Sequence, residues 1–272
     1  MQKFKLELLF HILGIGSASG LLYKDNSLFL ISDNSTFLYE YHIAEKELHK
    51  IKLFPESAEN IAKKDKPDFE AMTLKGNTLY VFGSGSTEKR NRLLGYDLGT
   101  KNLSEKDLRD LYAYLKEKSG ITNEDLNIEG AFFYNNALYL MQRGNGTLSK
   151  NGIFVIDDAK EDVPFYPITL PKIKNTEATF TDAIIANDTI YFLAAAENTT
   201  STYLDGEILG SFIGTIDAKT MTVQSATMIS EQHKFEGLTF YKNENGKMTF
   251  LICEDNDSDK LQSDIYKLTM EE

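Results

Sequence analysis

The sequence of 272 residues predicts an all-β fold, a five-bladed β-propeller that forms a single domain over residues 1–272. Its main evidence is a phrase that recurs five times: an apolar strand opened by a polar residue, a short turn, and a second apolar strand. The clearest copy runs from Phe69 to Gly83 and turns at residues 75–77, which read Lys-Gly-Asn. A repeat of this kind indicates units that bury their apolar faces against one another.

The spacing of the copies predicts a closed ring. The polar residues that open the five copies are Ser19, Glu70, Glu129, Thr181 and Glu236. They recur at intervals of about 50 to 60 residues, and the interval measured through the two termini falls in the same range. We therefore expect residues 3–12 to supply the outermost strand of the fifth blade and to close the circle.

Blade one is expected first along the chain. Its four strands are predicted over residues 17–23, 27–31, 36–43 and 47–54. In the last of these, Leu48, Ile51 and Leu53 stand among polar residues, which is typical of a strand with one buried face. A charged connector, residues 55–67, leads to blade two.

Blade two is expected to carry a helical insertion. Its fourth strand is predicted to be short or missing, and residues 104–119 read as a helix in its place. Ser104 can cap the start of this helix and Gly120 can end it. One apolar face is formed by Leu108, Leu111, Tyr112 and Leu115. Blades three, four and five are then expected over residues 127–170, 176–229 and 234–270.

The amino-acid composition limits which classes of ligand and partner the protein can bind. The net charge is −12, from 41 acidic and 29 basic residues, so a nucleic-acid backbone would be repelled. Cys253 is the single cysteine, which excludes an intrachain disulfide. No segment approaches the roughly 18 apolar residues that a membrane-spanning helix needs. A monomer is the default expectation, and an anionic small molecule is the expected ligand class.

The N-terminal residues weakly resemble a signal peptide, but Glu7 and His11 interrupt the apolar run. Lys3, Lys5 and Glu7 alternate with apolar residues, so a strand is the better interpretation. We expect a cytoplasmic protein from the sequence as written, and an exported one if a signal peptide was removed.

The five opening residues form the candidate metal site. In a propeller the first residue of each innermost strand faces the axis, so Ser19, Glu70, Glu129, Thr181 and Glu236 are expected to meet at one mouth. At ~6 Å and an effective dielectric constant of ~20, each pair of glutamates repels by about 3 kcal/mol. Protonation or a cation must relieve this repulsion. A set of oxygen ligands favours a hard cation, and a wide ring suits Ca²⁺ better than Mg²⁺.

A plainer alternative is that these residues bond backbone groups near the axis and hold water in the channel. Two further residues are candidates for catalysis at the same mouth. Arg143, the basic residue expected among these carboxylates, can clamp phosphate or carboxylate oxygens. Asp33 can position or deprotonate a water, although aspartate is also common in turns of this type.

This pattern resembles the calcium-activated nucleotidases, or apyrases, which are five-bladed propellers. That family carries a hydroxyl, Glu, Glu, hydroxyl, Glu order around an axial Ca²⁺, and the five opening residues here match that order position by position. The likeness extends to Ser32-Asp33 and Gln142-Arg143. Residues 83–90 lack the aromatic that the nucleotidases carry there, and the helix near 104–119 is additional. Residues 66–72 (Lys-Pro-Asp-Phe-Glu-Ala-Met) look more like uncharacterised bacterial phytase-like propellers.

Three functions stay open at this point. The first is a Ca²⁺-dependent hydrolase of a phosphate ester or anhydride, with Arg143 neutralising charge and Asp33 orienting the attacking water. The second is a non-catalytic binding propeller whose axial cation is structural. The third is a glycoside hydrolase with paired carboxylates, although the lack of tryptophan counts against sugar stacking.

Overall fold

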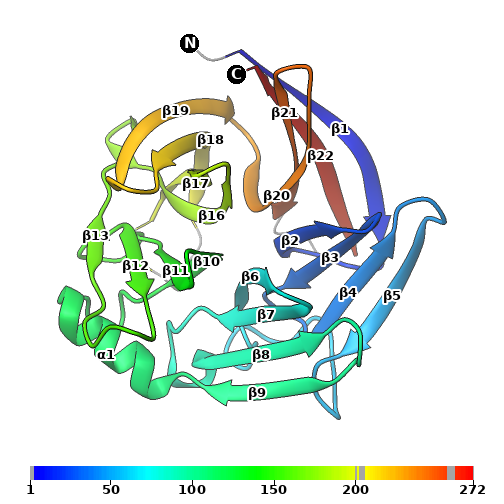
Figure 1. The fold of residues 1–272 in the computed structure, drawn as a ribbon, viewed down its shortest axis with the longest axis horizontal. Helices are drawn as coiled ribbons and strands as arrows, with labels where there is room; N and C mark the ends of the chain where they lie inside the picture. Colours follow the sequence, from blue (N-terminus) through cyan, green and yellow to red (C-terminus); the bar gives the residue numbers. More distant parts are fainter. Residues whose placement is uncertain (1–2, 200, 202–205, 256–260, 272) are drawn as a thin grey trace.

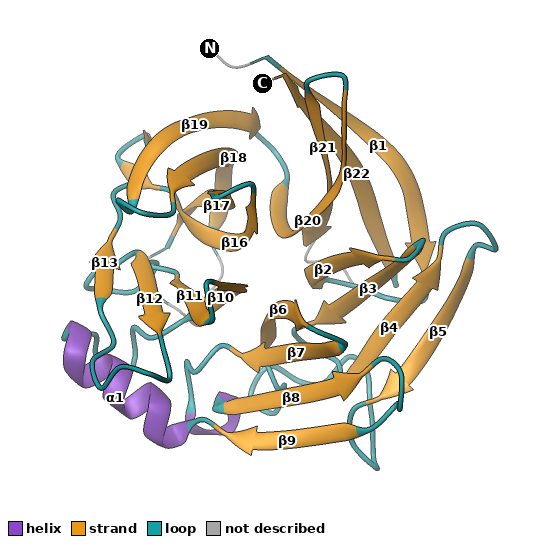
Figure 2. Ribbon diagram, in the orientation of Figure 1, coloured by secondary structure: helices purple, strands orange, loops and turns teal. Residues whose placement is uncertain are grey.

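The computed structural model describes residues 3–199, 201, 206–255 and 261–271. Over these residues, five four-stranded antiparallel sheets are arranged around a central axis (Figure 1). This confirms the predicted all-β, five-bladed propeller. The innermost strands β2, β6, β10, β16 and β20 surround the axis, and the other strands of each sheet lie progressively further out, ending with β5, β9, β13, β19 and β1 (Figure 2).

The first two blades follow the chain in order. Blade one holds β2 (Ala18–Lys24), β3 (Ser27–Ser32), β4 (Phe37–His42) and β5 (Glu47–Lys52). Blade two holds β6 (Phe69–Lys75), β7 (Thr78–Gly83), β8 (Arg92–Asp97) and β9 (Leu103–Asp107), with the short 3-10 helix η1 (Glu88–Arg90) before β8. The helix α1 (Arg109–Ser119) then leads to blade three.

The remaining blades complete the ring. Blade three holds β10 (Ile128–Tyr134), β11 (Ala137–Gln142), β12 (Gly152–Ile156) and β13 (Phe165–Pro167). A small hairpin of β14 (Lys172–Ile173) and β15 (Thr176–Glu177) leads to blade four, which holds β16 (Thr179–Ala186), β17 (Thr189–Asn198), β18 (Glu207–Asp217) and β19 (Thr222–Ser230). Blade five holds β20 (Lys234–Glu244), β21 (Lys247–Asp255), β22 (Gln262–Glu271) and β1 (Phe4–Leu13).

The N-terminal strand closes the ring, as the repeat spacing predicted. Strand β1 pairs antiparallel with β22, from Phe4 opposite Met270 to Leu13 opposite Gln262. The two ends of the described chain therefore lie side by side at blade five (Figure 1). No helix among the described residues has the length and apolar character needed to cross a bilayer.

The hydrophobic core is divided among the seams between blades. Five clusters of buried side chains each join two neighbouring blades, and the cluster between blades two and three also includes α1. In that cluster Leu108, Tyr112 and Leu115 are buried, as the predicted apolar face required. Each blade thus buries its faces only against the blades beside it, which explains why all five repeats are needed.

Blade two differs from the sequence prediction in one respect. Its fourth strand is present as β9, and Ser104 pairs within that strand opposite Gly95. Ser104 therefore does not cap the helix; α1 begins at Arg109 after Leu108, which makes no side-chain cap hydrogen bond. Because all five residues of β9 are exposed, the strand lacks the apolar alternation by which strands are recognised. The predicted end is correct, since Gly120 is left-handed with φ 64°.

Candidate metal centre at the axial mouth

A β-bulge occurs at the same position in all five innermost strands. In each one the pairing register with the next strand skips one residue near the start of the inner strand, and β20 skips a second residue, Tyr241, further along. The residues skipped at this shared position are Ser19, Glu70, Glu129, Thr181 and Glu236. A bulge redirects the side chain that it carries, and bulges are frequent near functional sites. The five residues aligned from the sequence are therefore equivalent in structure, and all five are buried.

The two hydroxyls of this ring connect neighbouring blades. Ser19 Oγ donates a hydrogen bond to the carbonyl oxygen of Phe69 at 2.5 Å, and Thr181 Oγ1 donates to the carbonyl oxygen of Phe235 at 2.6 Å. Each accepting residue immediately precedes the ring glutamate of the following blade. The plainer alternative from the sequence, that ring residues bond backbone groups near the axis, is therefore correct for these two hydroxyls. Their oxygen lone pairs stay free to accept from a ligand.

The three glutamates of the ring have unequal partners. Glu129 Oε1 accepts from Asn127 Nδ2 at 2.7 Å and from Arg143 Nη1 at 3.2 Å. Glu236 Oε1 lies 2.7 Å from Lys234 Nζ. Glu70 is only 9% exposed, and among the described residues no side chain or amide donates to its carboxylate. The unsatisfied acceptor capacity of the ring is therefore concentrated at Glu70.

Burial and mutual repulsion make these carboxylates difficult to ionise. Burial, followed by the charges of Asp68, Glu129 and Glu236, raises the pKa of Glu70 well above its ordinary value. Burial likewise raises the pKa of Glu236, although Lys234 opposes the shift. Burial also raises the pKa of Glu129, opposed by Arg143. The ring is thus short of positive charge, which is the condition that a bound cation would correct.

Arg143 lies in the mouth but its donors are already engaged. It follows β11 directly, is 4% exposed, and pairs with both Glu129 and Glu197, while its Nε donates to Thr179 Oγ1 at 3.3 Å. Burial alone would lower the pKa of Arg143, but the charges of the two glutamates raise it. The guanidinium is therefore a fixed positive charge that links blades three and four.

Asp33 lies at the seam between blades one and two. Its Oδ2 forms an ion pair with Lys66 Nζ, which also lies 2.9 Å from Asp68 Oδ1. Asp33 Oδ1 is buried and has no hydrogen-bond partner. One carboxylate oxygen each from Asp33, Asp68 and Glu70 lie within 4.8 Å of one another. The structure thus brings Asp33 next to a ring glutamate.

Three further cations of the mouth did not emerge from the sequence analysis. Lys66 pairs with Asp33 and Asp68, Arg90 Nη1 lies 2.7 Å from Asp68 Oδ2, and Lys234 pairs with Glu236 and, at 3.6 Å, with Asp255. The expectation of a single basic residue is therefore wrong. A usable signal existed, because Asp68 and Lys234 both stand two residues before a ring glutamate. That position forms a second polar tier beside the ring.

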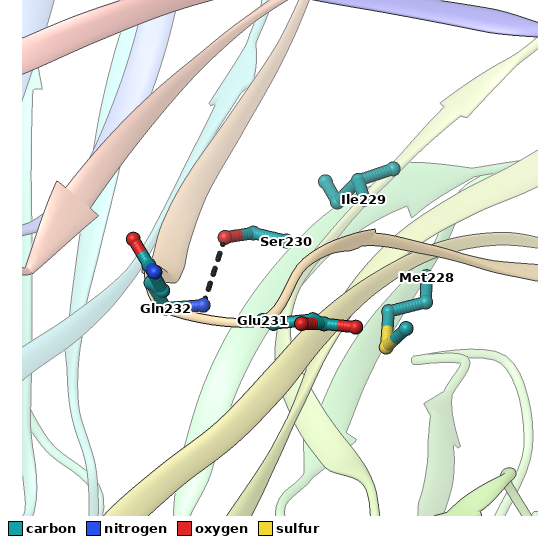
Figure 3. A pocket seen from close by; sticks show the side chains of 5 residues that line it. All are labelled: Met228, Ile229, Ser230, Glu231 and Gln232. Atoms are coloured by element: carbon teal, nitrogen blue, oxygen red, sulfur yellow. Dashed lines mark hydrogen bonds between the residues drawn. The ribbon is translucent and has the colours of Figure 1, made fainter.

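A hollow elsewhere on the surface lacks these properties. A depression of about 360 Å³ is lined by Met228, Ile229, Ser230, Glu231 and Gln232, at the end of the outermost strand of blade four (Figure 3). The backbone N–H of Gln232 donates to Ser230 Oγ at 3.1 Å, so this polar pair is satisfied internally. One carboxylate on a continuous stretch of chain does not make a convergent site, and the axial mouth is the better candidate.

Comparison with known proteins identifies a family for this chain and solved structures that share its fold. Residues 14–270 match the model of a family of unknown function, DUF6929. A comparison with curated proteins finds no match. The resemblance to the calcium-activated nucleotidases therefore stays a prediction.

Three solved structures resemble the whole chain. A glutaminyl cyclase from Myxococcus xanthus has a TM-score of 0.55 at 12% identity, covering 98% of this chain and 97% of that one. A PQQ-bound aldose sugar dehydrogenase from Streptomyces coelicolor has a TM-score of 0.57 at 11% identity, covering 99% of each chain. A mutant α-L-arabinanase from Cellvibrio cellulosa has a TM-score of 0.52 at 11% identity, covering 95% and 91%. At these identities the likeness shows a shared fold.

Proposed function

The chain belongs to the family of unknown function DUF6929, and we propose that it is a Ca²⁺-dependent hydrolase of a phosphate ester or anhydride with its site at the axial mouth. The observation that carries this proposal is Glu70, a buried carboxylate that lacks a partner among the described residues and is repelled by its neighbours. A buried anion of this kind is retained at a cost in stability unless a cation compensates it.

The residues that would hold the ion are Ser19, Glu70, Glu129, Thr181 and Glu236. Carboxylate and hydroxyl oxygens on five separate strands suit the irregular coordination that Ca²⁺ accepts. When bound, such an ion polarises phosphoryl oxygens and offsets the charge of the substrate. Because the mouth is otherwise rich in carboxylates, a phosphate ligand would be repelled without it. The proposal therefore requires strict dependence on the metal.

Two other side chains have assigned roles. Arg143 contributes a fixed positive charge on the side of Glu129, which favours an anionic ligand there. Asp33 keeps one buried carboxylate oxygen unpaired, and this oxygen can accept a hydrogen bond from the attacking water. Both act as positioned charges, consistent with the electrostatic character of phosphoryl-transfer catalysis.

The test is a hydrolysis assay of metal-free protein on a panel of nucleotides and phosphate esters, with Ca²⁺ or Mg²⁺ added back. We expect turnover with Ca²⁺ and a loss of at least about 100-fold in Glu70→Gln. Glu45→Gln is the matched control, because Glu45 is exposed in the loop between β4 and β5. Equal activity in EDTA and in Ca²⁺ would contradict the proposal.

A specific observation favours a second function, a binding propeller with a structural cation. Arg143, Lys66 and Lys234 each pair with two carboxylates, so these three cations of the mouth are occupied by the protein itself. For this function Ca²⁺ raises the melting temperature while every assay in the panel stays flat. Glycoside hydrolysis stays a third prediction, and including arabino-oligosaccharides in the same panel tests it.

A further inference from the structure

A second group of carboxylates lies off the axis, at the seam between blades one and two. Asp33 follows β3, Asp68 precedes β6, and Glu70 is the bulged residue of β6. The backbone N–H of Asp68 donates to the carbonyl oxygen of Asp33 at 3.0 Å, which fixes the two segments together. One oxygen from each of the three carboxylates lies within 4.8 Å of the others, a separation that a single ion can bridge.

The ammonium group of Lys66 lies against this cluster. Lys66 Nζ pairs with Asp33 and with Asp68 Oδ1. The other oxygen of Asp68 accepts from Arg90 Nη1 at 2.7 Å and from Ser84 Oγ at 2.5 Å. Asp68 is therefore satisfied on both oxygens.

The other two carboxylates retain unfilled acceptor capacity. Asp33 Oδ1 is buried without a hydrogen-bond partner, and Glu70 is nine-tenths buried and lacks a donor among the described residues. A buried acceptor left unpaired is unfavourable, and more so when it carries a charge. Lys66 and Arg90 together therefore satisfy Asp68 but leave acceptor positions open on Asp33 and Glu70, whereas a divalent ion with several ligand positions would fill them.

We propose that Asp33, Asp68 and Glu70 form a second Ca²⁺ site, and that Lys66 is a tethered cation which the incoming ion displaces. The inference rests on the proposed function only in sharing Glu70 with the axial ring. Lysine suits such a role because its compact charge sits on a flexible stem. Asp33 can act both as ligand and as hydrogen-bond acceptor, because each carboxylate oxygen has two lone pairs.

The first experiment removes the competitor. Metal-free full-length protein is titrated with Ca²⁺ in a calorimeter. Lys66→Gln is expected to bind one ion roughly 10–100-fold more tightly than the unaltered protein, because a competing positive charge at contact distance has been removed. Lys64→Gln is the matched control: it removes an exposed lysine from the same connector and should leave the affinity unchanged.

The second experiment tests whether the gain arises at this cluster. Adding Asp33→Asn to Lys66→Gln should abolish the tighter binding. The inference is overturned if Lys66→Gln binds no more tightly than Lys64→Gln, or if the double variant keeps the gain. Should Lys66→Gln fail to fold, Asp33→Asn with Lys66 intact is measured by equilibrium dialysis at saturating Ca²⁺. One fewer ion per chain is expected, and an unchanged number overturns the inference.

These outcomes are separable from those of the proposed function. Glu129→Gln alters the axial ring without altering the off-axis cluster. If the protein hydrolyses no substrate but Lys66→Gln still tightens Ca²⁺ binding, the second site stands and the proposed reaction is ruled out. If turnover depends on Ca²⁺ but Lys66→Gln leaves the Ca²⁺ affinity unchanged, the proposed reaction stands and the second site is ruled out.

Discussion

At one end of the propeller the inner hairpins turn through two residues, whereas at the other end each inner strand carries a bulge and a buried polar side chain. In the turns, φ is 50° and 64° at Asp25 and Asn26, and 49° and 66° at Asn135 and Asn136. These left-handed pairs are typical of the primed turns that match strand twist. The turn end thus follows the backbone preferences of its residues. The mouth, in contrast, buries charged side chains, a residue type that usually stays exposed.

The electrostatics of the two ends differ in the same way. At the turn end, backbone hydrogen bonds from the Thr100 and Thr220 segments lower the pKa values of Asp97 and Asp217. At the mouth, burial raises the pKa values of Glu70, Asp182 and Glu236. Ionised Asp97 and Asp217 therefore favour the folded state, whereas ionised Glu70, Asp182 and Glu236 oppose it. This contrast is the electrostatic pattern that the proposed cation site requires.

The largest expected effect comes from breaking the ion pairs of Arg143. Arg143→Ala leaves Glu129 and Glu197 buried without their shared cation, so we expect a loss of about 3–5 kcal/mol in the free energy of unfolding. Urea unfolding in EDTA measures it. Arg109→Ala is the control, since the ion pair of Arg109 with Asp107 is largely exposed and should contribute little. Equal losses in both variants would show that the buried ion pairs of Arg143 contribute no more to stability than an exposed one.

A pH profile of the metal-free protein is expected to show the two ends separately. Where the folded pKa of a carboxyl is raised, the native state holds more protons, so stability falls as pH rises from about 4.5 towards the folded value. The slope is at most about 1.4 kcal/mol per pH unit for each proton. Where the folded pKa is lowered, as at Asp97 and Asp217, stability falls as pH drops below about 3.8. Saturating Ca²⁺ should flatten only the upper limb; a flat upper limb without Ca²⁺ would contradict the proposed electrostatic cost.

Glu70→Gln is expected to stabilise the metal-free protein by roughly 1–2 kcal/mol, because it removes one buried repulsive charge. The same change should abolish the rise in melting temperature that Ca²⁺ gives. Calorimetric melting with EDTA or Ca²⁺ measures both effects. Glu45→Gln, exposed at the turn end, should alter neither, and a destabilised metal-free Glu70→Gln protein would show that Glu70 is structural.

The smallest effect is expected at the turn end itself. Asn136→Ala places a Cβ-bearing residue of low left-handed preference at φ 66°, at a cost of about 1 kcal/mol. Asn136→Gly should cost only a few tenths of that. Neither change should alter Ca²⁺ affinity measured by calorimetry. A changed affinity would mean that the two ends are coupled through β10 and β11.

The propeller fold and the five ring residues could be predicted from the sequence because both recur in every blade. Glu70 and Thr181 could be aligned with Ser19 without any knowledge of their neighbours, since strand periodicity and the turn that follows recur around the circle. Lys66 was missed because it lies in the connector before β6, and connector length varies from blade to blade, so no register relates one connector to the next. Lys234 does hold a fixed place, two residues before Glu236, but lysine does not recur at that place in the other blades. The pairing of Arg143 with Glu197 was missed because it joins residues 54 positions apart on different blades.

The closing strand has a consequence for synthesis of the chain. Strand β1 is synthesised well before its partner β22, so the fifth blade cannot be completed until all the residues between these two strands have emerged from the ribosome. During that time an extended segment that exposes Leu8, Leu9 and Leu13 even in the finished protein has an unpaired edge. Closure of this propeller thus depends on two segments that are far apart in the sequence, and we expect the form in which β1 is still unpaired to be the most prone to aggregate.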